Sequence, residues 1–200
     1  MTRTLEVARA EALGCTKCAL AGTRTQVVFG AGDARANLMF IGEAPGFHED
    51  KQGYPFVGAA GQFLNQMLTT IGLARDDVYI ANVLKCRPPG NRDPLPDEID
   101  ACKPWLKEQI ELVDPRVICT LGNFATRLLL GKQVGITKVR GQRFAWRGRV
   151  LVPTFHPAAI LRGGGRDAHL VEDDFRLIAK VLEEQHVEQT DPNAEQLGLF

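Results

Sequence analysis

The sequence lacks any long apolar run. No window approaches the roughly 20 consecutive apolar residues that a membrane-spanning helix needs, and residues 1–30 lack the apolar stretch of an export signal. These absences predict an intracellular protein that does not span a membrane. Internal repeats are absent as well, so a solenoid or an array of small modules is not expected.

The chain has five cysteines, which is an odd number. Without an export signal, an odd number favours metal ligation or buried thiols over disulfides. Cys15 and Cys18 form a C-x2-C pair, and Cys86 and Cys102 follow in a second segment. Four thiolates from two segments can hold either tetrahedral zinc or a 4Fe-4S cluster, and the spacing alone does not choose between them. Cys119, inside an apolar run, is expected to be a buried core thiol.

Net charge is absent too, since 24 Lys and Arg balance 24 Asp and Glu. The balance conceals a partition along the chain: residues 132–166 carry only basic charges, whereas residues 167–200 are mainly acidic. A basic surface that faces an anion is therefore plausible. The alternative interpretation of the basic segment is an ordinary solvated face.

Two hundred residues, of which 44% are hydrophobic, suit one compact α/β domain. Four short, mostly apolar segments rich in β-branched residues are typical of parallel strands covered on both faces; they span residues 37–42, 77–84, 116–122 and 149–156. Helical patterns alternate with them at residues 61–73, 97–113 and 169–184, with a short helix after Gly122. Residues 143–152 predict a hairpin that turns near Arg147 and Gly148. We expect a domain over residues 1–186 and a flexible acidic tail over residues 187–200.

Polar residues end three of the predicted strands. Gly42 and Glu43 end the first, Asn82 ends the second and His156 ends the last. Ligands of open parallel sheets bind outside the carboxyl ends of the strands. Each residue alone has an ordinary structural interpretation, such as a turn-forming Asn or a hydrogen-bonded structural His. Together they predict a binding site at this edge.

Five motifs carry a family resemblance, in order and spacing: GEAPG (residues 42–46), GYPFVGAAGQFLN (53–65), ANVLKCRPPGNRDPLPDE (81–98), ITKVRGQ (136–142) and HPAAILR (156–162). They resemble the family 4, iron-sulfur, uracil-DNA glycosylases, over about residues 13–180. The resemblance implies a three-layer α/β/α sandwich with a central four-stranded parallel sheet. It also implies a monofunctional enzyme that hydrolyses the bond between uracil and deoxyribose in single- or double-stranded DNA during base excision repair.

The resemblance implies a role for each residue at the strand ends. Phe56 would stack on a uracil that has been flipped out of the DNA. Asn82 would accept a hydrogen bond from uracil N3-H and donate one to O4, a pattern that cytosine reverses. His156 would donate to uracil O2 as negative charge develops there, with backbone N-H groups near Gly42 assisting. Glu43 would face the sugar and hold the attacking water, and Glu49 or Asp50 could share that task.

Contacts to the DNA backbone are expected from the basic segment. Leu161 would fill the gap left by the flipped base and Arg162 would hold a phosphate, unless the segment is an ordinary amphipathic helix start. Lys138, Arg140 and Arg143 are stronger candidates for phosphate contacts.

For the cysteines, the resemblance favours a 4Fe-4S cluster on Cys15, Cys18, Cys86 and Cys102, with a structural role near the DNA. One relative in the superfamily attaches covalently to DNA through a histidine in an RRIH-type loop. Here the corresponding loop reads GNRDP, which predicts ordinary turnover. The alternative from another class is a non-catalytic iron-sulfur module that binds nucleic acid or acts in redox chemistry.

The last five residues, QLGLF, end a polar tail with exposed apolar side chains. They resemble the peptide by which bacterial repair proteins bind the sliding clamp, with Gln196, Leu197, Leu199 and Phe200 at the matching positions. The alternative is that Leu199 and Phe200 fold back on the domain. The resemblance as a whole predicts a monomeric, cytoplasmic bacterial protein associated with the nucleoid.

Overall fold

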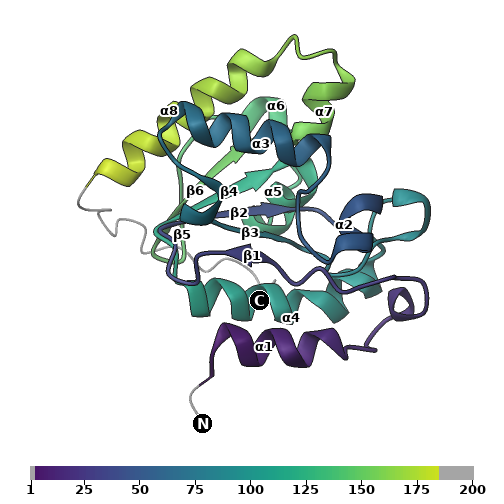
Figure 1. The fold of residues 1–200 in the computed structure, drawn as a ribbon. Coiled ribbons are helices and arrows are strands. Elements are labelled where there is room, and N and C mark those ends of the chain that lie inside the picture. The colour runs from purple at the N-terminus through teal and green to yellow at the C-terminus, as the bar shows by residue number, and fades with distance from the viewer. Residues whose placement is uncertain (1–2, 185–200) are drawn as a thin grey trace.

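The computed structural model describes residues 3–184, which form a mixed sheet between layers of helices (Figure 1). The strands lie in the order β1-β3-β2-β4-β6-β5. Their bounds are β1 Ala31–Gly32, β2 Leu38–Gly42, β3 Tyr79–Asn82, β4 Val117–Leu121, β5 Phe144–Trp146 and β6 Arg149–Thr154. The four central strands, β3, β2, β4 and β6, are parallel, as predicted. Short antiparallel strands extend both edges, β1 beside β3 and β5 beside β6.

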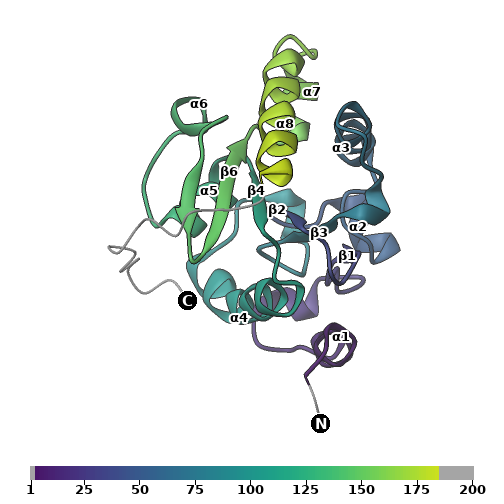
Figure 2. The ribbon, with the colours of Figure 1, turned by 90° about the vertical axis from the view of Figure 1, so that its left-hand side faces the viewer.

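Helices cover both faces of the sheet (Figures 1 and 2). One face carries α3, α7 and α8, and the other carries α4 and α5, with α1 packed outside α4. Three 3-10 turns span Ala19–Gly22, Arg75–Asp77 and Pro89–Asn91. The α-helices are α1 Leu5–Leu13, α2 Phe47–Gln52, α3 Ala59–Thr70, α4 Pro96–Val113, α5 Gly122–Leu130, α6 Ile136–Val139, α7 Pro157–Arg162 and α8 Ala168–Glu183. This arrangement confirms the predicted three-layer α/β/α class.

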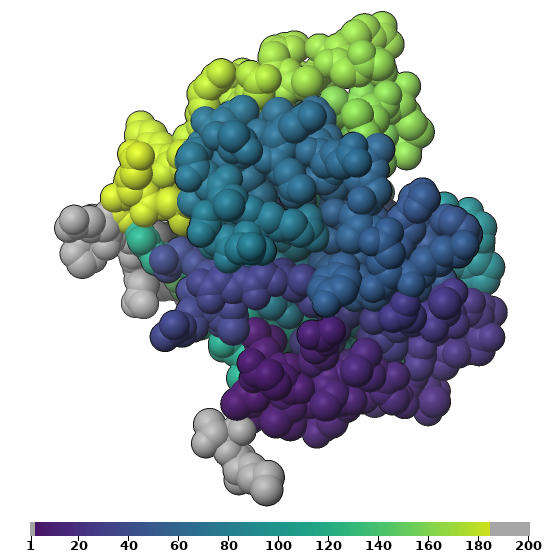
Figure 3. Space-filling view, viewed as in Figure 1, coloured from purple at the N-terminus to yellow at the C-terminus, as the bar shows by residue number. Residues whose placement is uncertain are grey.

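The two apolar cores follow from the alternation of side chains along each strand. In β2, Leu38 and Phe40 pack toward α3 and α8, whereas Met39 and Ile41 join the core beneath α4. Every residue of β2 is buried, as expected for a parallel strand covered on both faces. Figure 3 shows that α3 (blue) and the segments next to it largely hide the strands from this side, with α8 along the upper edge and α1 below.

The predicted hairpin is present, and its turn lies at the predicted residues. Arg147 and Gly148 both have positive φ, 48° and 76°, which is the conformation of the two-residue turns that fit the twist of paired strands. The turn connects β5 to β6, and β6, whose carboxyl end leads to His156, pairs along its other edge with β4.

Much of the basic segment is paired within the protein. Arg140 forms an ion pair with buried Asp174, Arg143 with Glu184, and Arg149 with Asp114. Two of these acids come from α8 and its end, so the acidic and basic stretches of the sequence partly neutralise each other. The predicted anion-facing surface is therefore smaller than the count of charges suggested.

Two sequence predictions concern membrane spans and the C-terminal tail. Among residues 3–184, no helix is long and apolar enough to cross a bilayer. The predicted acidic tail and its terminal QLGLF lie outside the described residues.

Candidate functional site

A cavity of about 630 Å³ opens at the carboxyl edge of the parallel strands. Residues that follow all four parallel strands reach it: Glu43 after β2, Asn82 at the end of β3, Gly122 after β4 and His156 after β6. The predicted convergence is therefore present in the structure. Other lining residues are Pro45, Gly46, Glu49, Phe56, Asn91, Arg92, Asp93, Asn123, Phe124, Phe155 and Arg162.

Gly42, at the end of β2, has no room for a side chain. A Cβ atom at this position would lie 2.8 and 2.9 Å from Cζ and Cε2 of Phe56, and closer still to Oδ1 of Asn82. The missing side chain thus lets the Phe56 ring and the Asn82 amide meet over the end of β2. Glycine is required here for space, which is a role different from the backbone donor that the resemblance implies.

Asn82 lines the cavity and has an unpaired, buried side-chain acceptor. Its side chain is buried, with 2% of the residue exposed, and its Oδ1 has no hydrogen-bond partner within residues 3–184. Buried polar atoms are nearly always paired in native proteins, so an unpaired one at a cavity wall indicates a ligand group. A donor on the ligand, such as an imide N-H, would satisfy Oδ1.

The Phe56 ring lies against the imidazole of His156. The two ring centroids are 5.7 Å apart, with an interplanar angle of 30°. Phe56 has φ of 50°, which is unusual for an aromatic residue, and Nη1 of Arg75 donates to its carbonyl at 3.0 Å. Gly61 allows this backbone to approach α3, because a Cβ there would overlap the Phe56 carbonyl. The ring is therefore positioned by its own main chain.

The structure determines which nitrogen of His156 carries a proton. The backbone N-H of Ala158, in the first turn of α7, donates to Nδ1 at 3.1 Å. Nδ1 must therefore be unprotonated, which leaves Nε2 as the N-H donor of a neutral imidazole. Burial, together with the positive charge of Arg162, lowers the pKa of His156 to about 4. His156 is thus a neutral hydrogen-bond donor, not an acid, at neutral pH.

Glu43 lies in the turn after β2 and borders the cavity. Burial, with a smaller effect of the like charge on Asp93, raises the pKa of Glu43 above its ordinary value. The other two candidate carboxylates bind backbone instead. Glu49 accepts from the N-H groups of Gly46, Val57 and Gly58 at 3.1, 2.9 and 3.1 Å. Asp50 accepts from Thr25 N at 2.9 Å. Glu49 thus holds the loop beside the cavity and Asp50 holds the backbone at Thr25, which favours Glu43 for the chemistry.

The predicted DNA contacts separate into two groups. Leu161, on α7, leaves 41% of its surface exposed, and neighbouring Arg162 lines the cavity. Lys138 is also exposed. In contrast, Arg140 donates to Asp174 and to the Leu170 carbonyl, and Arg143 donates to Glu184. The structure therefore gives Arg140 and Arg143 partners within the protein.

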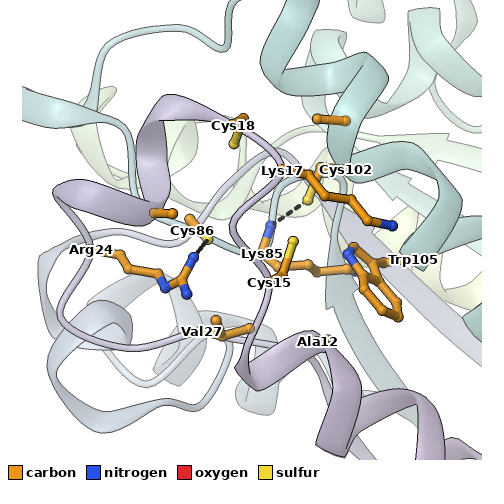
Figure 4. A pocket seen from close by; sticks show the side chains of 12 residues that line it. Ala12, Cys15, Lys17, Cys18, Arg24, Val27, Lys85, Cys86, Cys102 and Trp105 are labelled. Carbon is orange, nitrogen blue, oxygen red and sulfur yellow. Dashed lines mark hydrogen bonds between the residues drawn. The ribbon is translucent and has the colours of Figure 1, made fainter.

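Four cysteines surround a second, smaller hollow between the segment after α1, the loop after β3 and the helix α4 (Figure 4). Cys15 and Cys18 are partly buried, and Cys86 and Cys102 are buried. Lys17, Arg24 and Lys85 line the same hollow, and Nη1 of Arg24 donates to Sγ of Cys86 at 3.5 Å. These cations would offset the charge of thiolates. Burial raises the pKa of the Cys102 thiol to about 11, so without a bound cation this thiol is protonated at neutral pH.

The four sulfurs surround the hollow instead of converging on one point. Among residues 3–184, no group of three or more His, Cys, Asp or Glu side chains is arranged to hold a metal ion. Trp105 also lines the hollow, and its buried Nε1 has no hydrogen-bond partner in the described part of the chain. The four sulfurs could hold a metal cofactor, with the unused Trp105 N-H beside them. Cys119 lies apart from them, fully buried in β4 as predicted.

Sequence reasoning missed three residues of this region. Asp93 adds negative charge near Glu43, Arg75 holds the Phe56 main chain, and Lys85 lies buried between the cavity and the cysteines. Only Lys85 had a visible signal, since it is a lone charge after the apolar run of β3, next to a candidate ligand.

Comparison with known proteins gives matches over most of the chain. The model of the uracil DNA glycosylase superfamily matches residues 29–183. A type-4 uracil-DNA glycosylase of Sulfurisphaera tokodaii is 46% identical over 186 residues, covering 88% of this chain and 84% of that protein. The type-4 uracil-DNA glycosylase of Thermotoga maritima is 48% identical over 160 residues, covering 79% of this chain and 83% of the relative. One from Archaeoglobus fulgidus is 44% identical over 180 residues, covering 86% and 89%.

Proposed function

Since the chain belongs to the uracil-DNA glycosylase superfamily and, within it, to the type-4 enzymes, we propose that it removes uracil from DNA by hydrolysing the bond between uracil and deoxyribose. The product is an abasic site, and the activity belongs to base excision repair. The observation that carries this proposal is the buried, unpartnered Oδ1 of Asn82, next to the ring of Phe56 and in the same cavity as His156.

Base recognition requires the nucleotide to leave the duplex, because a stacked base cannot reach the cavity. The flipped uracil would stack on Phe56 and donate from N3-H to Oδ1 of Asn82. Cytosine has no hydrogen on N3 and presents an amino group in place of O4, so it meets a rigid Asn82 with the wrong pattern. The packing of Asn82 against Gly42 supports that rigidity.

Bond cleavage leaves negative charge on uracil and positive charge on the sugar. The Nε2-H of His156 would donate to uracil O2, where the negative charge gathers. A neutral donor, already oriented by Ala158 N-H, needs no rearrangement during the reaction. Glu43 would hold the attacking water and stabilise the positive sugar as a carboxylate. The electron pair of the glycosidic bond leaves with the base, water supplies the hydroxyl group that replaces it on the sugar, and the remaining proton of that water balances the uracil anion, so that neutral uracil is the product.

DNA would bind across the mouth of the cavity. Leu161 is exposed beside it and fits the role of a wedge that fills the space of the flipped nucleotide. Arg162 and Lys138 would contact phosphates. We leave Arg140 and Arg143 out of this set, because their guanidinium groups are held by Asp174 and Glu184.

The cysteine hollow fits a 4Fe-4S cluster bound by Cys15, Cys18, Cys86 and Cys102. Each thiolate of such a cluster binds a different iron, so the ligands surround a space, as they do here. The cluster would supply structural cross-linking: its ligands tie the segment after α1 and the loop after β3 to α4. The cations around the hollow and the unused Nε1-H of Trp105 suit its negative charge.

The terminal QLGLF lies outside the described residues, so its proposed role rests on sequence. Gln196, Leu197, Leu199 and Phe200 would bind a bacterial sliding clamp as an extended peptide with apolar anchors, while the tail tethers the glycosylase near DNA. Removal of residues 196–200 should abolish clamp binding in calorimetry and leave uracil release from short oligonucleotides unchanged. Equal clamp affinity for both proteins, or none for either, would contradict this role.

A single assay tests the central proposal. Excess protein is mixed with labelled oligonucleotides that carry uracil in a single strand, opposite guanine or opposite adenine, and abasic sites are cleaved with alkali. We expect product from all three, because Asn82 reads uracil without reference to the opposite base, and none from matched cytosine oligonucleotides. No product in any context would instead favour the non-catalytic iron-sulfur module.

A further inference from the structure

Lys85 occupies an unusual position for a lysine. Among the residues that the structure describes it is the only buried lysine, with 2% of its surface exposed. Lysine is almost never buried without partners. Nζ of Lys85 donates to the main-chain carbonyl of Asn82 at 2.6 Å and to Oε1 of Gln109. The backbone N-H of the same residue donates to Sγ of Cys102 at 3.2 Å (Figure 4). Lys85 therefore contacts both the base-reading residue and a cysteine of the hollow.

The contact with Asn82 replaces a missing strand neighbour. Successive backbone groups of a strand point to opposite edges, and Val83 N-H donates to the Gly42 carbonyl on the β2 side. The Asn82 carbonyl consequently faces the other edge, where β1 pairs only with Tyr79 and Ile80. Without Lys85, this buried acceptor at the end of β3 would lose its partner.

The Lys85 ammonium group is also bound by Gln109, a residue of α4. Nε2 of Gln109 donates to the Phe29 carbonyl at 2.7 Å and to the Tyr79 hydroxyl at 3.1 Å, which orients Oε1 toward Lys85. The same helix carries Cys102. A chain of hydrogen bonds thus runs from α4 through Lys85 to the main chain of Asn82, the residue whose side-chain amide reads the base.

We propose that Lys85 is a positioning residue for uracil recognition. It holds the Asn82 main chain in a fixed position relative to helix α4, which carries Cys102. The inference rests on the proposed uracil-DNA glycosylase function. It assigns Lys85 no contact with DNA and no part in proton transfer. Its consequence is that loss of the Lys85 side chain should act through Asn82, and not simply through folding.

A double-mutant cycle tests this directly. Lys85→Met removes the donor and nearly preserves the side-chain volume, and its single-turnover rate on uracil oligonucleotides should fall between about 10-fold and 100-fold, as expected when a recognition group shifts slightly. In an Asn82→Ala background, followed over hours, the same Lys85→Met change should alter the rate by less than about twofold. An equal loss in both backgrounds would overturn the proposal, because a general folding effect is additive.

Two further variants and one measurement separate a positioning role from a role of charge or of cluster binding. Lys85→Gln retains an amide donor and should be faster than Lys85→Met. Lys107→Met removes an exposed charge from the same helix α4, at a position that lines neither the cavity nor the hollow, and should leave the rate within about twofold of the unmutated protein. Iron content and visible absorbance of Lys85→Met should match the unmutated protein; iron loss that parallels the rate loss would show that Lys85 serves the cysteine site instead.

The outcomes also distinguish this proposal from the function on which it rests. If the unmutated protein releases no uracil, the proposed function fails before Lys85 is tested. If the unmutated protein is active and Lys85→Met is equally fast, only the role of Lys85 is refuted. If Lys85→Met does not accumulate in folded form, Lys85→Gln replaces it in the double-mutant cycle with Asn82→Ala. Additive losses of rate in that cycle would again contradict the proposal.

Discussion

Gly42→Ala is the smallest change that should disable the site while preserving the fold. Gly42 ends β2, and its backbone conformation is one that alanine can adopt, since its φ lies outside the positive region. The added methyl group would nevertheless lie 2.8 Å from the Phe56 ring and closer still to Asn82 Oδ1. The base-stacking ring and the base-reading amide are therefore displaced by one substitution.

The size of the effect follows from these distances. Non-bonded heavy atoms normally lie about 3.5 Å apart, so the Phe56 ring must retreat by roughly 0.7 Å and Asn82 Oδ1 by roughly 1.2 Å. A misplacement of this size costs about 10²-fold in rate. Overpacking costs about 1 kcal/mol or more in a closed core. Here Phe56 and Asn82 border a cavity of about 630 Å³ into which they can move, so the loss of folding stability should stay near about 1 kcal/mol.

Single-turnover uracil release and thermal unfolding, measured on the same samples, check this prediction. We expect a rate loss of about 10²-fold with a fall in melting temperature of only about 2–4 °C. Gly58→Ala is the matched control, because a Cβ there meets its nearest neighbours at an ordinary 3.6 Å. If Gly42→Ala releases uracil at the unmutated rate, the positions of Phe56 and Asn82 do not matter for recognition.

Three other outcomes are expected. His156→Ala should slow single-turnover cleavage by about 10²-fold or more, the scale for removing one donor to a developing oxyanion, and an unchanged rate would remove His156 from the chemistry. Because the pKa of Glu43 is raised, activity should be lost as the pH falls through a pKa higher than that of an ordinary glutamate. Asp93→Asn removes a like charge near Glu43, so it should move this acid limb of the pH–rate profile to lower pH. Cys86→Ala should lose iron, colour and thermal stability together, whereas Cys119→Ala, in the buried β4 position away from the hollow, should retain its iron as judged by metal analysis.

Much of the architecture was accessible from sequence because parallel strands share one carboxyl edge. Apolar runs located the four parallel strands, and the polar residues that end them, Glu43, Asn82 and His156, had to converge once the strands were parallel. The hairpin was equally local, since Arg147 and Gly148 occupy a two-residue turn. The two-residue strand β1 was missed because a segment this short has no measurable periodicity.

The details of the site depend on partners that are distant in sequence. Charge composition made Arg140 a candidate for phosphate binding, but the packing of α8 brings Asp174 against it. The spacing of the cysteines allowed zinc or a cluster and the family resemblance favoured the cluster, whereas only the folded structure places Cys15, Cys18, Cys86 and Cys102 around one hollow.

Sequence by itself determined the family, the parallel sheet and the residues at its carboxyl edge, because these depend on short-range patterns and on the chemistry of single side chains. Tertiary structure alone decided the hydrogen bonds, the protonation and the packing of those residues. The proton on His156 Nε2 follows from a backbone N-H that α7 supplies, and the absent side chain of Gly42 matters only because Phe56 and Asn82 close over it. Lys85 connects Asn82 to α4 for the same reason: contacts between separate elements exist only after the elements have packed.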